Sequence, residues 1–531
     1  MAWNDPNTTP AWWRGAVTYE IYVRSFADSD GDGVGDLPGI TRRLPYLRDL
    51  GVDAIWLTPF YSSPQHDHGY DVADYCDVDP LFGDLAAADD LLGTAHDLGL
   101  RVIVDLVPNH TSSDHEWFQA ALAAGPGSRE RARYLFRDGR GEGGSEPPNN
   151  WQSVFGGPAW TRVEDREGGG QWYLHLFDTT QPDLDWRNPE VPEMFERVLR
   201  FWLDRGVDGF RVDVAHGLFK EASLRDQEAT PGGGSSGSMV ERRLMDEPMW
   251  DQPEVHDVYR RWRRVLDDYD DDRMAVAEAW TQTAESMARF VRPGELSQTF
   301  NFGWLLADWS ASAFADVISS TLTAMQPAGA APTWVLSNHD VVRHPTRYGG
   351  GTRGLARARA ATLTMLALPG SAYLYQGEEL GLEEVDVAPR DWQDPASLRT
   401  GERGRDGCRV PIPWEGTTAP YGFGPGEDQP WIPQPDDWDG LTVAAQTGAE
   451  GSTLEFYRAA LRSRREHTLD LGNEVTLVEG RRDVLTLRRG PVTVVLNCGD
   501  VSVPLPDGEV LVASAPVDHG RLPADAAAWV R

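Results

Sequence analysis

The sequence predicts an α/β protein: a (β/α)8 TIM barrel with an inserted subdomain after strand 3 and a C-terminal antiparallel β-sandwich. Three observations support this fold class. Apolar, β-rich segments alternate with helical patterns eight times between residue 17 and about residue 465. A long Gly-, Trp- and Asn-rich stretch interrupts this alternation after the third strand, and short alternating strands follow residue 468. Eight consecutive β/α units imply parallel strands that close into a barrel.

Each β/α unit begins with an apolar run that ends in polar or aromatic residues. The predicted strands are 17–26, 52–60, 100–110, 207–216, 274–280, 298–304, 333–340 and 372–379. The predicted helices are 38–50, 85–98, 192–205, 255–269, 283–291, 305–325, 354–367 and 453–467. A doubly wound open sheet is the structural alternative, but no Gly-rich phosphate-binding loop follows the first strand.

The interruptions of the pattern indicate where the domains begin and end. We expect the barrel to comprise residues 1–110 and 189–467, the inserted subdomain 111–188, and the C-terminal sandwich 468–531. A structureless loop as long as 111–188 is uncommon, so we interpret this stretch as a subdomain. The segment 217–254 contains a Gly/Ser-rich run and is expected to overhang the barrel mouth.

Composition excludes several classes of function. The net charge of −34 disfavours nucleic acids and anionic membranes as partners. No stretch approaches about 18 continuous apolar residues, so we expect no membrane span. The three cysteines lie far apart and form no metal or disulfide pattern. The first residues lack the features of a signal peptide, so we expect a cytoplasmic protein, either a monomer or a homo-oligomer.

Acidic residues gather where the predicted barrel strands end, which is where barrel enzymes carry their chemistry. Arg211 and Asp213 share one face of a strand because they are two residues apart. A guanidinium holds a neighbouring carboxylate ionised, so Asp213 is a candidate nucleophile, with a structural Arg–Asp pair as the alternative. The other acidic strand ends are Asp105, Glu278, Asp340, Glu378 and Glu379. Their mutual repulsion is unfavourable and therefore indicates a function.

Closely spaced carboxyl groups push their pKa values apart, so one can act as a nucleophile and another as a general acid. Retaining glycoside hydrolysis needs such a pair, about 5 Å apart. A metal hydrolase is the alternative, but His110, His216 and His339 lack the spacing of a zinc site. These histidines fit hydrogen-bond donors to sugar hydroxyls better, and His216 could equally be a core residue.

Four segments, in this order and on these strands, resemble the signature segments of the α-amylase family of glycoside hydrolases: DLVPNH, GFRVDVAHG, EAW and SNHD. The segment GYDVADYCDVDPLFGDL strengthens the resemblance. QPDLDW resembles the mark of the oligo-1,6-glucosidase and α-glucosidase (maltase) branch. The resemblance extends from Trp12 through the C-terminal sandwich, and it implies the barrel fold as well as the activity.

The resemblance implies a role for each matching residue. Asp213 matches the nucleophile, Glu278 the general acid and then base, and Asp340 the carboxylate that holds the 2- and 3-hydroxyls. Asp105 matches a structural neighbour. The residues implied in substrate binding are Tyr70, Asp71, His110, Phe155, Phe177, Arg211, His339 and Arg409. Among them Tyr70 and Asp71 match the ring and the carboxylate that hold the non-reducing glucose, and Arg409 closes the pocket.

The segment from Asp28 to Asp36 has the oxygen-ligand spacing of a calcium loop, with glycine at the turn. The candidate ligands are the side chains of Asp28, Asp30, Asp32 and Asp36 and the backbone carbonyl of Val34. The loop lacks the glutamate of an EF-hand, and a solvated acidic turn is the alternative. The branch of the family carries a divalent-ion loop of this form, so the resemblance implies a structural Ca²⁺ or Mg²⁺. No organic cofactor is expected.

A pocket that binds every hydroxyl of a terminal glucose cleaves from the chain end. We therefore expect a retaining, exo-acting α-glucosidase that acts on maltose-like oligosaccharides through a covalent glucosyl-enzyme. In the family, valine after the nucleophile, here Val214, accompanies α-1,6 cleavage, which would make the protein an oligo-1,6-glucosidase. The next residues, Ala215 to Gly217, depart from the usual α-1,6 sequence. A transglucosylase would use the same covalent intermediate, and a non-catalytic sugar-binding protein would use the same pocket without the reaction.

Overall fold

Eight parallel strands form a closed barrel in the computed structural model, which describes residues 11–164, 170–228, 247–426, 429–469 and 471–531. The strands are β1 (Val17–Ile21), β2 (Ala54–Leu57), β5 (Arg101–Leu106), β9 (Gly209–Val212), β10 (Met274–Ala277), β11 (Gln298–Asn301), β12 (Thr333–Val335) and β13 (Ser371–Tyr375). Neighbours in the barrel follow the chain order, and β13 closes onto β1. This topology confirms the predicted barrel.

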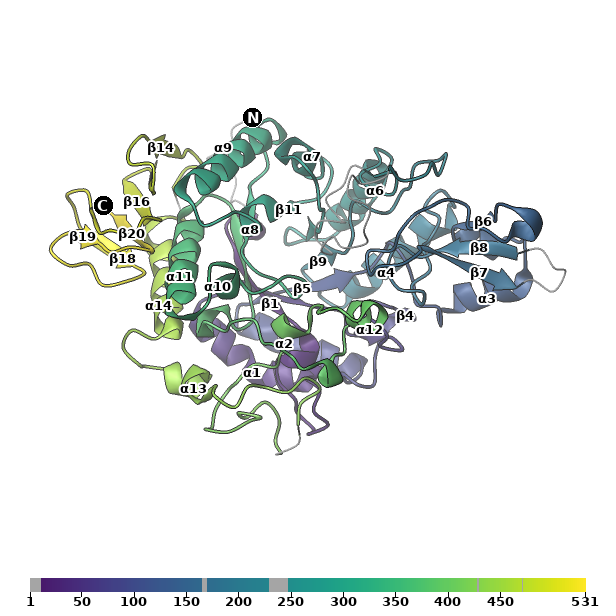
Figure 1. Cartoon of the computed structure of the whole chain (residues 1–531), viewed down its shortest axis with the longest axis horizontal. Coiled ribbons are helices and arrows are strands. Elements are labelled where there is room, and N and C mark those ends of the chain that lie inside the picture. The colour runs from purple at the N-terminus through teal and green to yellow at the C-terminus, as the bar shows by residue number, and fades with distance from the viewer. Residues whose placement is uncertain (1–10, 165–169, 229–246, 427–428, 470) are drawn as a thin grey trace.

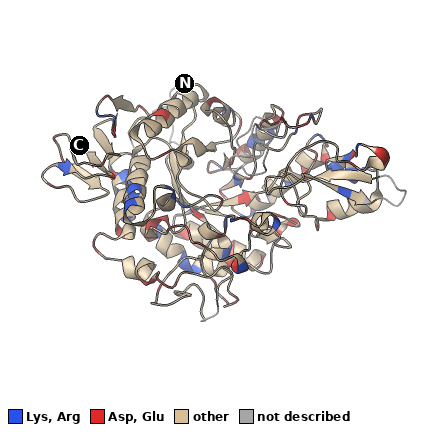
Figure 2. Ribbon diagram, in the orientation of Figure 1, with Lys and Arg blue, Asp and Glu red and all other residues tan. Residues whose placement is uncertain are grey.

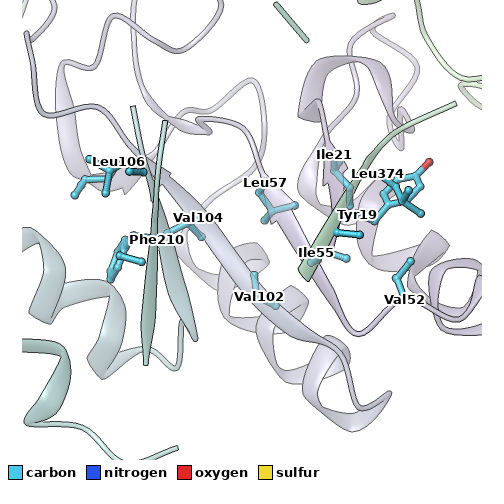
Figure 3. Close-up of a cluster of buried hydrophobic side chains, with 14 of the residues drawn as sticks. Tyr19, Ile21, Val52, Ile55, Leu57, Val102, Val104, Leu106, Phe210 and Leu374 are labelled. Atoms are coloured by element: carbon cyan, nitrogen blue, oxygen red, sulfur yellow. The ribbon is translucent and has the colours of Figure 1, made fainter. Parts of the chain in front are cut away.

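Each strand alternates between two buried environments because successive side chains point to opposite faces. One set packs against the helices outside, as Figure 3 shows for Ile55, Val104 and Phe210. The other set, which includes Trp56 and Ile103, fills the barrel interior. Burial on both faces explains why the strands read as apolar runs rather than as an alternating pattern.

The helices between the strands form the outer layer of the barrel (Figure 1). They are α1 (Leu37–Leu50), α2 (Leu85–Asp97), α4 (Glu190–Asp204), α6 (Val255–Asp267), α7 (Ala284–Arg289), α8 (Phe302–Leu305), α9 (Ala311–Ala328), α11 (Gly351–Ala367) and α14 (Thr453–His467). The prediction of one helix at 305–325 was wrong in its start. Asn301 caps α8 and Ser310 caps α9, and these two N-caps separate the segment into two helices.

The stretch between β5 and α4 forms a small unit of its own, at one end of the long axis of the molecule (Figure 1). It contains α3 (Glu116–Ala124) and an antiparallel sheet in the order β6 (Phe136–Asp138), β8 (Gly170–Leu174), β7 (Trp160–Glu164). A hairpin of β3 (Tyr61–Ser62) and β4 (Asp74–Val78) follows β2. Three short helices, α10 (His344–Arg347), α12 (Pro395–Thr400) and α13 (Val443–Gln446), lie in the loops near β12 and after β13.

Antiparallel sheets at the opposite end of the molecule confirm the predicted C-terminal β-structure. Five strands pair in the order β14 (Thr476–Val478), β15 (Val484–Arg489), β16 (Val492–Asn497), β20 (Ala526–Val530), β18 (Val510–Ala513). A second sheet of β17 (Val503–Pro504) and β19 (Arg521–Leu522) packs on one face through Val495 and Val503.

Apolar and charged contacts join this C-terminal unit to the barrel. The buried Trp529 donates its indole N–H to the carbonyl of Leu363 in α11. Basic residues are spread along α11 (Figure 2), and Arg353 and Arg357 each lie within 2.9 Å of Asp525. Within the described ranges, no helix has the length and apolar character needed to cross a membrane. Of the segment 217–254 that is expected to overhang the barrel mouth, residues 229–246 lie outside the described residues.

Candidate active site

One buried guanidinium joins the ends of three adjacent strands. Arg211 Nη1 lies 2.9 Å from Asp105 and 2.6 Å from Asp213, and its Nη2 lies 3.0 Å from Glu278. The register of β9 places Arg211 directly beside Asp105 of β5, so the strand pairing itself brings these groups together. Burial alone would lower the pKa of Arg211, but Asp105, Glu278 and Asp213 outweigh it and raise that pKa well above its ordinary value.

Asp105 supports this arginine from inside the barrel. Both its oxygens accept from Arg211, and Oδ2 also accepts from the Tyr70 hydroxyl at 3.0 Å and the Trp56 indole at 3.2 Å. Burial raises the pKa of Asp105 to about 6, against the opposing effect of Arg211. These contacts fit the structural role that the sequence suggests for Asp105.

Glu278 is fixed by donors to both of its oxygens. Oε1 accepts from the Trp280 indole at 2.7 Å, and Oε2 accepts from the backbone N–H of Val214 at 2.9 Å. Val214 has a φ of 45°, which is a left-handed conformation that β-branched residues rarely adopt. Such conformations cost on the order of 1–3 kcal/mol. In the turn that follows Asp213, the backbone N–H of Val214 therefore points at Glu278, the candidate acid/base.

The third predicted carboxylate, Asp340, is held by two arginines. Its Oδ1 accepts from Arg405 Nη1 at 3.1 Å and from Arg409 Nη2 at 3.0 Å. Arg405 was not identified from the sequence, although it lies only four residues before Arg409 in the same segment. A bidentate pair with Asp394 orients its guanidinium. The short distance in sequence to Arg409 was the one signal that could have found it.

A cavity with about 250 Å³ of space lies among these groups. It is lined by Asp67, Tyr70, His110, Phe155, Phe177, Asp213, His339, Asp340 and Arg405. The structure thus gathers seven of the predicted site residues around one space, with Arg211, Glu278 and Arg409 bonded behind or beside them. Only about 10 Å³ of this space can hold the centre of a water molecule, so the cavity is narrow with the side chains as they stand. Larger hollows lie elsewhere, lined by residues such as Arg14 and Arg464.

The predicted role of Asp71 was wrong, because the cavity is lined by Asp67 instead. The Asp71 carboxylate accepts from the backbone amides of His66 and Asp67 and from the Ser63 hydroxyl. These bonds hold a tight loop and occupy the group. Asp67 instead accepts from Arg405 at 2.9 Å and from Gln181 at 3.0 Å. Both aspartates occur in HDHGYD, and the sequence alone did not show which of the two would face the cavity.

Burial sets the charge state of two further groups at the cavity. It raises the pKa of Asp67 to about 6, although Arg405 and Arg409 favour the ionised form. Burial also lowers the pKa of His339 well below its ordinary value, so this ring is neutral. The His339 ring stacks on Tyr70, with ring centroids 5.3 Å apart, and its Nδ1 lies 2.5 Å from Glu20. The stack fixes both rings against the cavity.

Two of the remaining predicted residues, Phe155 and Phe177, lie on the wall that the 111–188 stretch contributes. The Phe155 and Phe177 rings meet edge to face at 5.6 Å, and the Arg405 guanidinium lies 4.8 Å from the Phe155 ring. His110 Nε2 lies 3.0 Å from the Tyr70 carbonyl. The His216 ring stacks on Trp250 at 4.9 Å and is buried, which agrees with a packing residue.

The acidic loop after β1 brings three carboxylates together. Oxygens of Asp28, Asp30 and Asp36 all lie within 4.8 Å of one another. Burial raises the pKa of Asp36, and the neighbouring Asp30 adds to this shift. The hard oxygen donors therefore fit Ca²⁺ or Mg²⁺, whose charge would relieve the repulsion. The Asp32 carboxylate accepts from the backbone amide of Val34 and does not belong to this group of three carboxylates.

Comparisons with known proteins agree with this geometry. The family model described as the alpha amylase catalytic domain matches residues 20–472. A probable alpha-glucosidase of Rhizobium meliloti is 40% identical over 497 residues, covering 90% of this chain and 87% of the relative. An oligo-1,6-glucosidase of Parageobacillus thermoglucosidasius is 35% identical over 496 residues, covering 86% and 84%.

Among solved structures, the alpha-glucosyl transfer enzyme XgtA has a TM-score of 0.87 at 39% identity, covering 98% of this chain and 100% of the other. The trehalulose synthase MutB of Pseudomonas mesoacidophila MX-45 has a TM-score of 0.86 at 29% identity, covering 98% and 100%. The similarity therefore extends over the barrel, the inserted stretch and the C-terminal sheets.

Proposed function

The chain belongs to the α-amylase family of glycoside hydrolases, and we propose that it is a retaining, exo-acting α-glucosidase for maltose-like di- and short oligosaccharides. Homologues named alpha-glucosidase and maltase at 35–40% identity support hydrolysis of α-glucosides. The geometry of the site supports the specific mechanism and the mode of attack.

In the proposed mechanism, an Asp213 oxygen attacks the anomeric carbon and forms the glucosyl-enzyme. Glu278 gives its proton to the glycosidic oxygen, so the aglycone leaves as a neutral alcohol. Glu278 then takes a proton from water, which attacks the same carbon and releases glucose and the free Asp213 carboxylate. Two inversions give net retention. Arg211 contacts both groups and so keeps Asp213 ionised and fixes its position relative to Glu278.

One observation carries the exo mode of attack: a single guanidinium bridges two carboxylates across the cavity. Arg405 Nη2 binds Asp67, from the loop between β3 and β4, and Nη1 binds Asp340, from the loop after β12. We infer that this bridge blocks one end of the cavity, so a substrate chain would have no room beyond its terminal glucose. An enzyme that cleaves bonds inside a polysaccharide needs a cleft open at both ends.

Transglucosylation is the second candidate, because the structural neighbours include a glucosyl transfer enzyme at 39% identity. It would use the same glucosyl-enzyme but pass glucose to a sugar hydroxyl. A time course on maltose, isomaltose, sucrose and trehalose separates the candidates. We expect free glucose from maltose. Glucose chiefly from isomaltose would establish an α-1,6-glucosidase, and early longer oligosaccharides would establish a transferase.

We also propose that the Asp28–Asp36 loop binds a structural Ca²⁺ or Mg²⁺. The ion would stabilise the folded state, since a ligand that binds only the native protein raises its melting temperature. We expect chelation to lower the melting temperature of the wild-type protein and of Asp32→Asn, and added Ca²⁺ to restore it. Asp30→Asn should lose this response. An unchanged melting curve after thorough chelation would remove the proposed ion.

A further inference from the structure

The one lysine of the chain, Lys220, lies buried beside the candidate active site. Its ammonium nitrogen is 2.6 Å from Asp183 Oδ2, 2.7 Å from Asn109 Oδ1 and 2.6 Å from the Gly217 carbonyl. An ammonium group has three N–H donors, so these three acceptors use all of them. The proposed mechanism assigns this group no role.

Each acceptor lies close in sequence, or is hydrogen-bonded, to a segment that contributes a residue to the cavity lining. Gly217 ends the turn that begins at the candidate nucleophile Asp213, four residues earlier. Asn109 precedes His110, which lines the cavity, and its amide lies 3.2 Å from the His110 ring. The lysine therefore ties the end of β5 to the turn after β9.

Asp183 connects Lys220 to the segment of the 111–188 stretch that contains Phe177. Its Oδ1 accepts from the Leu176 amide at 2.8 Å, while Oδ2 binds Lys220 and also accepts from Asn109 at 3.0 Å. Leu176 precedes Phe177, an aromatic wall of the cavity. One ammonium group thus connects a segment of the 111–188 stretch with two strand ends of the barrel.

The presence of a lysine at this position indicates that the geometry of its three N–H donors matters, and not only its positive charge. The other 48 of the 49 basic residues are arginine, so the chain uses arginine wherever a cation suffices. A guanidinium is a planar fork, whereas an ammonium is a compact centre with three donors that can meet three acceptors around one point. Burial lowers the pKa of Lys220, although Asp183 favours the charged form. Buried ion pairs add little net stability over apolar residues of equal volume, so stability does not explain the lysine.

We propose that Lys220 is a positioning residue that fixes the nucleophile segment, His110 and Phe177 in place relative to one another. This inference rests on the proposed hydrolysis at the cavity. Lys220 itself does not line the cavity, so its effect on the reaction passes through Gly217, Asn109 and Asp183.

The main experiment removes the connection without leaving a buried charge. The double variant Lys220→Met/Asp183→Asn loses both charges, so it should fold with a melting temperature near that of the wild type. Its kcat on maltose should fall about 100-fold, which is the effect of a displacement of about 1 Å at reacting groups. KM should change less, and the pH optimum should stay, because the reacting carboxylates are intact. Lys220→Arg should not restore kcat.

A matched control removes a buried pair that lies outside the cavity. His256 and Glu295 are 2.8 Å apart and both buried. His256→Met/Glu295→Gln should lower the melting temperature, because Arg260 and Arg292 also lose their carboxylate partner, while leaving kcat at the wild-type value. Wild-type kcat in the Lys220→Met/Asp183→Asn variant, or an equal loss of kcat in both variants, would overturn the positioning role. A wild-type protein that hydrolyses none of the four disaccharides would instead refute the proposed function.

A second measurement needs no variant, because Lys220 is the single lysine. Acetic anhydride should modify the α-amino group quickly and Lys220 slowly, and peptide mass spectrometry separates the two. Glucose at concentrations that saturate product inhibition should slow the labelling of Lys220 further, since its exposure requires opening contacts that border the cavity. Labelling of Lys220 that glucose does not affect would contradict the connection.

Discussion

Two groups of buried carboxylates lie at the strand ends of the same barrel, and their surroundings differ. In the first group, Asp213, Glu278 and Asp340 each contact a guanidinium. In the second group, at the end of β13, Glu379 accepts from the hydroxyls of Tyr19 and Tyr46, both at 2.7 Å. The sequence suggested that the acidic strand ends share one rim of the barrel; in the structure Asp213 and Asp340 line the cavity, whereas Glu378 and Glu379 do not.

The partners of the two groups explain their difference in charge state. Glu378 accepts from the Tyr375 amide at 3.0 Å and the Tyr457 hydroxyl at 3.4 Å, and burial raises its pKa to about 8. At neutral pH it is mostly protonated. Arg211 instead favours the ionised form of Asp213, the proposed nucleophile. An acidic strand end is therefore a candidate for catalysis only where the fold supplies a cation and an opening.

The largest difference should appear when each group loses a carboxylate. Asp213→Ala should lower kcat by several orders of magnitude, because it removes the nucleophile. Glu378→Gln should leave kcat within a few-fold of the wild type, since an amide replaces a protonated carboxyl group. Glucose release from maltose measures both. Substantial activity in Asp213→Ala would overturn the assignment.

The second-largest loss of activity should come from removing Arg405, a guanidinium that contacts Asp340 of the first group. Arg405→Met leaves Asp67, Asp340 and Asp394 without their shared partner. Loss of one partner from a buried ion pair costs about 3–5 kcal/mol. This cost falls on the stability of the fold, and misplacement of the Asp67 and Asp340 carboxylates should lower kcat/KM on maltose about 100-fold. The exposed Arg403 is the control, and Arg403→Met should behave as the wild type. Equal kcat/KM in the two variants would argue against the bridge.

The pH profile should sharpen the comparison further. The pKa of Asp67 is about 6, so protonation below that pH weakens its bond to Arg405. We expect kcat/KM of the free enzyme to fall as the pH drops below about 6. Asp67→Asn should raise KM and lose this limb of the profile. Asp71→Asn should lower the melting temperature but keep the limb. A limb that persists unchanged in Asp67→Asn would assign it to another group.

The smallest effect concerns stability in the second group. The pKa of Glu378 is higher in the folded protein, about 8, than the ordinary value of 4.5. Its stabilising contribution is therefore complete below about pH 4.5 and is lost as the pH rises through about 8. Between pH 5 and pH 9 the melting temperature of the wild type should fall by a few degrees more than that of Glu378→Gln. Parallel melting curves would show that Glu378 is not protonated in the folded state.

Local patterns predicted most of the fold. The eight strands and the helices around them follow from apolar runs and periodic faces, which depend on neighbouring residues. The C-terminal sheets follow from short alternating segments in the same way. The position of Arg211 and Asp213 on one strand face also follows from a period of two, and the structure places both at the site.

The sequence by itself therefore determined the barrel and which strand ends carry acidic groups, because these depend on short-range spacing. Apart from the Arg211–Asp213 pair, only the tertiary structure decided which of those groups meet a cation. Asp67 and Asp71 differ by four residues, yet one binds Arg405, which is 338 positions away, and the other binds its own loop. Lys220 likewise joins Asn109 and Asp183 across long separations. Contacts between distant segments arise only when the chain closes on itself, and no local pattern encodes them.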